Sequence, residues 1–158
     1  MQKPSVVHAT FVIERAFPAP IERVFAAFAD PAKKLRWFGE GVHTSVVEFE
    51  MDFREGGTER LRLRFKKEGT LFPGVELVNN TSYLEIVPTS RIVTASTMSM
   101  GGKRISASLV TIELLARGEG TDLICTHQGA FFEGSDGPQI REQGWQKLFE
   151  RLAAELAA

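Results

Sequence analysis

The residues best suited to chemistry in this 158-residue chain are three histidines, His8, His43 and His127, and a single cysteine, Cys125. No two of the histidines form an i, i+4 pair, and no carboxylate joins them at the spacing of a metal-ligand set. The lone cysteine excludes an intramolecular disulfide and any site built from several thiolates. We therefore expect no metal site.

Nucleotide and nucleic-acid chemistry are also disfavoured. The chain contains neither a glycine-rich phosphate loop ending in Gly-Lys nor a Gly-x-Gly-x-x-Gly fingerprint. Its 19 Lys and Arg residues are balanced by 20 Asp and Glu residues, so the formal net charge is -1. Proteins that bind nucleic acid usually carry a positive surplus. We expect no cofactor and no nucleic-acid partner.

His127 is the histidine with the most informative surroundings. It follows Leu123 and Cys125 at a spacing of two, so the three side chains share one side of a predicted strand and are expected to face the core. An imidazole in an apolar pocket can orient a ligand carbonyl or transfer a proton. A structural histidine with its hydrogen bonds satisfied is the alternative that the pattern favours.

A second pair of polar residues, Tyr83 and Glu85, alternates with Leu84 and Ile86. Only one of the two pairs can line the core of a regular strand. We expect Leu84 and Ile86 to face inward, because burial of an unpaired carboxylate costs several kcal/mol. The other arrangement would offer a hydroxyl and a carboxylate to a ligand.

A basic row, made of Arg60, Arg62, Arg64 and Lys66, alternates with apolar residues on the same predicted strand. It could bind an anion. The preceding strand carries Glu48 and Glu50 with matching alternation, so we expect a solvated outer face with cross-strand ion pairs.

These residues belong to a chain with one predicted α+β domain, residues 1–158. The order begins with a strand over residues 8–17, a helix from Pro20 and a short helix over Pro31 to Trp37. Further strands are predicted at residues 43–50, 59–66, 75–87, 91–98, 106–115 and 122–132, with short turns between them. Antiparallel neighbours follow from such short connections.

A long helix closes the chain. We expect Ser135 or Asp136 to cap it and Pro138 to start it. Its apolar stripe is Trp145, Leu148, Phe149, Leu152 and Leu156. Gly144 inside the helix indicates either a close backbone approach or open room beside it.

The ends and the composition of the chain bear on its location. The N-terminal segment lacks the long apolar core of a secretion signal, and no run approaches the ~18 apolar residues of a membrane span. A hydrophobic fraction of 43% and a charged fraction of 25% are typical of a globular protein. We expect a cytoplasmic location.

Several segments, taken in order, resemble one family. They are residues 11–31, Leu35-Arg-Trp-Phe-Gly39, Met51-Asp-Phe-Arg-Glu-Gly-Gly57, residues 83–93, and the closing helix with Gly144-Trp145. The chain resembles proteins related to the C-terminal domain of the activator of Hsp90 ATPase, which belong to the START-like, or Bet v 1-like, superfamily, also described as SRPBCC. This resemblance implies a helix-grip fold, with a curved antiparallel sheet wrapped around a long C-terminal helix. The segment from Gly69 to Ser82 is longer than the resemblance leads us to expect.

The resemblance also implies an elongated, largely apolar cavity between the sheet and the C-terminal helix. Strand side and helix stripe select its candidate ligand-binding residues. They are Trp37, Phe38, Leu63, Phe65, Ile112, Leu114, Leu123, Cys125, His127, Trp145, Phe149 and Leu152. Trp37 and Phe38 either gate the entrance or fill the core.

The leading hypothesis is a non-catalytic module that binds a hydrophobic or amphipathic small molecule, lipid-like or polyketide-like. An alternative is an enzyme of the polyketide cyclase or dehydratase kind, with His127 and Glu85 as acid and base. A chaperone regulator follows from the family name alone and ranks below both. The ligand and the oligomeric state, with a homodimer as one alternative, stay open.

Overall fold

The first strand, β1 (Val7–Phe17), forms one edge of a seven-stranded antiparallel sheet with the order β1-β7-β6-β5-β4-β3-β2. The computed structural model describes residues 5–39 and 41–158, so the first four residues of the segment that argues against a secretion signal lie outside it. The other strands are β2 (Thr44–Met51), β3 (Thr58–Phe65), β4 (Glu76–Val87), β5 (Arg91–Met100), β6 (Lys103–Arg117) and β7 (Gly120–Phe131). The predicted antiparallel sheet is confirmed.

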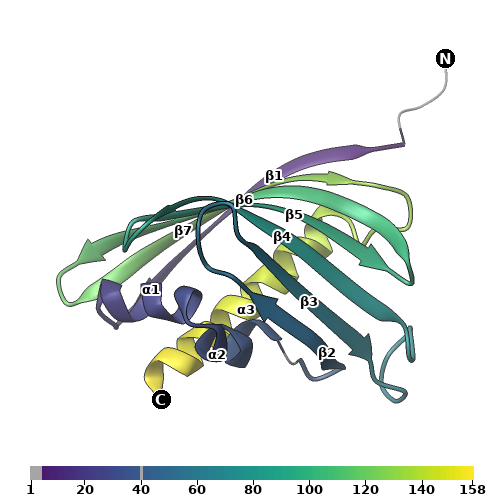
Figure 1. Ribbon diagram of the computed structural model, residues 1–158, viewed down its shortest axis with the longest axis horizontal. Helices are drawn as coiled ribbons and strands as arrows, with labels where there is room; N and C mark the ends of the chain where they lie inside the picture. The colour runs from purple at the N-terminus through teal and green to yellow at the C-terminus, as the bar shows by residue number, and fades with distance from the viewer. Residues whose placement is uncertain (1–4, 40) are drawn as a thin grey trace.

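All helices lie on one side of this sheet (Figure 1). They are α1 (Ile21–Ala29), α2 (Pro31–Lys34), the π-helical turn η1 (Leu35–Gly39) and α3 (Pro138–Ala157). Asp30 starts α2, since its Oδ1 accepts hydrogen bonds from the backbone N–H of Ala32 and Lys33 at 2.9 and 3.2 Å. The helix-grip architecture, with α3 running beneath a curved sheet, is therefore confirmed.

The inner face of the sheet, which faces α3, carries the apolar core. Alternate residues of β6 and β7 point to it, so that Leu123 and Cys125 are fully buried between their exposed or half-buried neighbours. Phe149 and Leu152 of α3 meet them with no exposed surface. The core thus lies between the sheet and the helices, and it extends from Phe11 on β1 to Tyr83 on β4.

The alternation predicted for Tyr83 to Ile86 is wrong, because β4 has a bulge between Tyr83 and Glu85. Tyr83 is buried, Leu84 in the bulge is 53% exposed, and Ile86 returns to the core side. Glu85 lies on the outer face, where Arg91 donates two hydrogen bonds of 2.9 Å to its carboxylate. These hydrogen bonds hold the pKa of Glu85 below its usual value. The core side therefore takes one residue from each predicted pair, Tyr83 and Ile86.

The start of α3 also differs from the expected cap. Gly137 precedes the helix with a φ of 85°, and no side chain caps it. Asp136 instead accepts hydrogen bonds of 2.8 and 2.9 Å from Arg141, one turn into the helix. Arg141 is buried, although the helix pattern places it off the apolar stripe. The carboxylate is used to neutralise a buried guanidinium.

The basic row behaves as predicted. Arg60 donates to Glu48 at 2.7 Å across the β2–β3 pair. Arg62 and Arg64 both donate to Glu76 of β4, a partner that the sequence pattern did not single out. The row is a solvated outer face held by cross-strand pairs.

The long segment from Gly69 to Ser82 is a loop followed by the first half of β4. Leu71 and Phe72 at the loop tip are 90% and 44% exposed. Gly69 and Gly74 have φ values of 76° and 77°, which favour glycine because other residues rarely adopt them. The extra residues therefore project from the end of the sheet rather than adding to its core.

The register of β6 predicts a sharp contrast between two adjacent leucines. Leu114 is 5% exposed on the inner face and Leu115 is 51% exposed on the outer face. We expect Leu114→Ala to lower the free energy of unfolding by about 2–5 kcal/mol and Leu115→Ala by no more than about 0.5 kcal/mol. Urea denaturation measures both, and equal losses would contradict the register.

Candidate functional site

One row of cross-strand neighbours crosses the inner face from edge to edge. In register order its members are Ala9, Gly129, Ser108, Ser96, Thr81 and Glu59, from β1, β7, β6, β5, β4 and β3. We call this set the inner row. The hydroxyls of Thr81 and Ser96 lie 2.7 Å apart and hydrogen-bond to each other. Small and polar side chains thus interrupt an otherwise apolar face.

A buried charged group ends the inner row on β3. The Lys34 Nζ of α2 lies 2.6 Å from Glu59 Oε1, and the Tyr83 hydroxyl donates to the same oxygen. All three residues are less than 9% exposed. Lys34 Nζ also lies 4.5 Å from the centre of the Phe38 ring. Burial, and then the charge of Glu59, raise the pKa of Tyr83, so its hydroxyl stays protonated and acts as a donor.

His127 lies beside the other end of the row, 1% exposed. Its ring stacks on Phe11 with 4.5 Å between the ring centres and meets Trp145 edge-on at 6.3 Å. Its Nδ1 has no hydrogen-bond partner, and neither has the buried Oγ of Ser108. Burial, followed by the charge of Arg141, lowers the pKa of His127 to about 4, so the imidazole is neutral at pH 7.

Arg141 of α3 lies near His127 and contacts the ends of β6 and β7. Its guanidinium donates to Ser106 Oγ at 2.9 Å as well as to Asp136, and it lies over the Phe131 ring at 5.1 Å. Burial alone would raise the pKa of Asp136, but the hydrogen bonds from Arg141 outweigh it and keep that pKa below its usual value. The pair stays ionised and joins α3 to β6.

Most of the predicted cavity residues come together. Trp37, Ile112, Leu114, Leu123, Cys125, Phe149 and Leu152 belong to one buried cluster, with Phe38 and Trp145 half-buried against it and His127 beside it. Leu63 is buried on β3 apart from this cluster, and Phe65 lies against Phe72 at 5.8 Å instead. Trp37 is 1% exposed and donates its Nε1–H to the Ala27 carbonyl, so it fills the core. Phe38 meets Trp145 at 6.0 Å.

The positions of Cys125, His127 and Glu85 in the structure decide which chemistry they can perform. Burial raises the pKa of Cys125 to about 12, so it is an inert thiol rather than a nucleophile. His127 and Glu85 lie on opposite faces of the sheet, which separates the acid–base pair of the enzyme hypothesis.

Lys34 and Glu59 are not among the site residues that the sequence predicts. A signal for Glu59 was present, because it shares strand side with Leu61 and Leu63 and so had to be buried. Nothing local in the sequence marks Lys34, whose partner lies 25 residues further along the chain.

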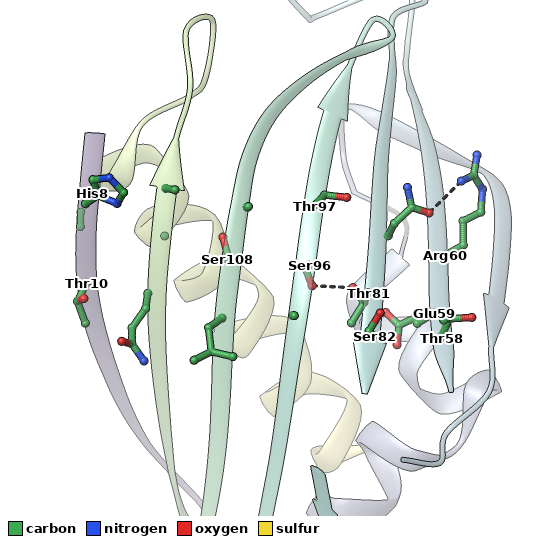
Figure 2. A pocket seen from close by; sticks show the side chains of 18 of the residues that line it. His8, Thr10, Thr58, Glu59, Arg60, Thr81, Ser82, Ser96, Thr97 and Ser108 are labelled. Atoms are coloured by element: carbon green, nitrogen blue, oxygen red, sulfur yellow. Dashed lines mark hydrogen bonds between the residues drawn. The ribbon is translucent and has the colours of Figure 1, made fainter. Parts of the chain in front are cut away.

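A hollow with a volume of about 860 Å³ lies on the outer face of the sheet. Figure 2 shows it with α3 behind the strands. Two outer rows flank it, which include Thr10, Ser82 and Thr97, and residues of the inner row also line it. Ala95 and Ala107 line the hollow with small side chains that leave it open. The groove is open and uncharged at its centre.

Within the described part of the chain, no three His, Cys, Asp or Glu residues gather in a way that could hold a metal ion. None of the helices in residues 5–39 and 41–158 is long and apolar enough to span a bilayer.

The chain belongs to the family of activator of Hsp90 ATPase homolog 1-like proteins (AHSA1), whose model matches residues 18–157. Among solved structures it is similar to the protein Mll3558 from Rhizobium loti, with 46% identity, 97% of this chain and 100% of that chain covered, and a TM-score of 0.85. A protein from Rhizobium leguminosarum is 37% identical, with 97% of both chains covered and a TM-score of 0.87. Protein CV1439 from Chromobacterium violaceum is 27% identical, with 94% and 97% covered and a TM-score of 0.77. No curated protein matches the chain.

The buried ion pair predicts an asymmetric response to substitution. Glu59→Ala leaves the Lys34 charge buried without a partner, so we expect a loss of about 3–5 kcal/mol in the free energy of unfolding. The double variant Lys34→Met with Glu59→Leu should recover most of that loss, since it removes both charges. Glu48→Ala, which breaks a partly exposed pair with Arg60, should cost about 1 kcal/mol or less. Chemical denaturation measures all three, and a double variant as unstable as Glu59→Ala would contradict the interpretation.

His127 predicts a pH dependence of stability. Its pKa is about 4 in the folded chain and about 6.5 when unfolded, so the unfolded state binds the proton more tightly. The contribution is complete above pH 6.5 and is lost as the pH falls toward 4, a change on the order of 2–3 kcal/mol. His127→Phe should flatten this part of the curve, whereas His8→Gln, at an exposed position, should leave it unchanged. Denaturation from pH 4 to 7 tests this, and an unaltered slope in His127→Phe would refute it.

Proposed function

We propose that this protein is a cytoplasmic module that binds a hydrophobic or amphipathic small molecule between the inner face of the sheet and α3. The observation that carries the proposal is an inner face that the helices leave partly open. Asn79, Thr94 and Met98 of β4 and β5 point to the inner face and are half-buried, although they take no part in the outer groove. Space therefore reaches the inner face above these two strands.

The flank of α3 that faces this space supports the proposal. Arg151 and Glu155 contact Arg36 of η1, through hydrogen bonds of 3.4 and 2.7 Å. Gly144 lies on the same flank, two helical turns before Arg151, because spacings of three and four return to one helix face. A Cβ added at Gly144 would meet no atom within 4 Å. Of the two alternatives for this glycine, open room is the one that applies.

The chemistry of the walls suits an apolar ligand. Phe38 and Trp145 are half-buried beside the opening, and the fully buried cluster below them supplies a rigid apolar support. Removal of ligand surface from water contributes about 25 cal/mol per Å² of apolar area. Leu63 and Phe65 of β3, the two predicted residues outside the cluster, take no part in this wall.

The direct test is native mass spectrometry of the protein purified from its own host, followed by extraction and identification of any bound hydrophobic molecule. We expect an adduct of one small molecule per chain. A chain that carries nothing, and that also fails to bind the fluorescent probe anilinonaphthalene sulfonate, would refute the proposal.

Gly144 predicts where a ligand can be blocked. Gly144→Leu places a side chain in the opening, so we expect it to weaken binding of anilinonaphthalene sulfonate about tenfold without lowering the melting temperature. Gln143→Leu is the matched control, because Gln143 is exposed and points away from the buried stripe. Fluorescence titration measures both affinities. Equal effects of the two substitutions would contradict this location of the opening.

A further inference from the structure

We infer that the loop between β3 and β4, residues 66–75, is a membrane-docking tip, which inserts its apex into the surface of a bilayer that contains anionic phospholipid. This loop belongs to the segment from Gly69 to Ser82, which is longer than the family resemblance leads us to expect. The inference goes beyond the proposed function, because the loop projects from the end of the sheet and the ligand site lies beneath its inner face.

The apex of the loop exposes apolar side chains. Leu71 is 90% exposed and Phe72 is 44% exposed. Val42, just before β2, is 82% exposed, and its segment meets the loop where the Lys66 N–H donates to the His43 carbonyl at 2.9 Å. Of the large apolar residues in the described part of the chain, Leu71 and Val42 have the highest exposed fractions. Single exposed apolar residues need no explanation, but a group of them marks an interaction site.

The backbone of the loop holds this apex in one shape. The Val75 N–H donates to the Phe72 carbonyl at 3.1 Å, and residues 72–75 have Pro and then Gly, with a φ of 77°, at their two central positions. This is the pattern of a type II turn. Phe65 closes the base through hydrogen bonds of 2.9 Å with Val75 and Gly74, and its ring lies 5.8 Å from that of Phe72. The loop therefore needs little ordering when it docks.

Basic side chains surround the base of the loop. Lys66-Lys67 follows β3 directly and is exposed. The β5–β6 turn lies alongside, because the Gly101 N–H donates to the Glu76 carbonyl at 2.9 Å, and the exposed pair Lys103-Arg104 follows this turn. Figure 1 shows both connections at the same end of the sheet. No ion pair joins any of these four basic side chains to another residue in the described part of the chain.

This arrangement fits a bilayer better than a protein partner or a second copy of the chain. An apolar apex beyond a ring of positive charge matches a surface in which anionic headgroups lie outside the acyl chains. Three exposed apolar side chains fall far short of the roughly 20–30 residues a side of a stable protein interface. Glu68 and Glu133 offset part of the positive charge, so insertion of the apex carries most of the binding.

The experiment is sedimentation of the full chain with sucrose-loaded vesicles. One set contains phosphatidylcholine alone, and the other contains a two-to-one mixture of phosphatidylcholine and phosphatidylserine. We expect binding to both, at least about fivefold tighter to the mixed vesicles, because basic side chains near an anionic surface add to the attraction. Added salt should remove this difference.

Leu71→Asn should weaken binding to both kinds of vesicle about tenfold, because it removes apolar surface without a change of charge. Leu115→Asn is the matched control. Leu115 is 51% exposed near the opposite end of β6 from Lys103, so its substitution should leave both affinities unchanged. Lys66→Gln combined with Lys67→Gln should weaken binding to the mixed vesicles about fivefold and leave the neutral vesicles unaffected.

Each other outcome is decisive. Absence of binding to both kinds of vesicle overturns the inference, and so does a loss that Leu115→Asn shares with Leu71→Asn or a preference for mixed vesicles that the lysine variant retains. A dimer in sedimentation velocity that Leu71→Asn disperses, with no vesicle binding, would assign the apex to a second copy and overturn it too. None of these results bears on the proposed function, which the native mass spectrometry tests separately.

Discussion

The width of the sheet is the constraint on which the rest of the structure depends. Seven strands at the usual spacing span about 29 Å, whereas an α-helix with its side chains is about 10–12 Å wide. One helix cannot cover such a face. In this protein α3 packs beside β1, α1 lies against β6 and β7, η1 lies against β2, and α2 reaches β3 through Lys34. The inner face of β4 and β5 lies between the regions that these helices cover. Several side chains there are half-buried because no helix packs directly on them.

The same constraint accounts for a charged group inside the fold. The α2 segment is short, and it approaches β3 through Lys34 rather than through a large apolar stripe. Glu59 supplies the opposite charge and Tyr83 a third member, so no charge is left without a partner. Such a group contributes less to stability than an apolar contact of equal size, but it accepts only one arrangement of its partners. It fixes where α2, and therefore η1 beside the opening, lies against the sheet.

Features that depend on local chemistry could be predicted from the sequence, and features that depend on distant partners could not. The Asp30 cap, the strand alternation and the ion pairs of Arg60 follow from spacing within a few residues or between adjacent strands. The bulge after Tyr83 could not be predicted, since the hydrogen bond from Tyr83 to Glu59 is a tertiary contact. The candidate site follows the same division. Its apolar wall follows from periodicity, whereas its polar row appears only once the register is known.

At Gly129 the inner row is packed so tightly against neighbouring aromatic rings that no side chain fits. A Cβ there would lie 2.7 Å from the Phe131 ring and 2.9 Å from the imidazole of His127. Any side chain would displace one of the two rings, and with it either the contact of Phe131 with Arg141 or the stack of His127 on Phe11. On the outer side of the same region, Ala95, Ala107 and Ala130 lie among larger residues such as Leu109 and Gln128. The small residue at this position therefore leaves room for both rings, and a larger one would disturb contacts with α3, through Arg141, and with β1, through Phe11.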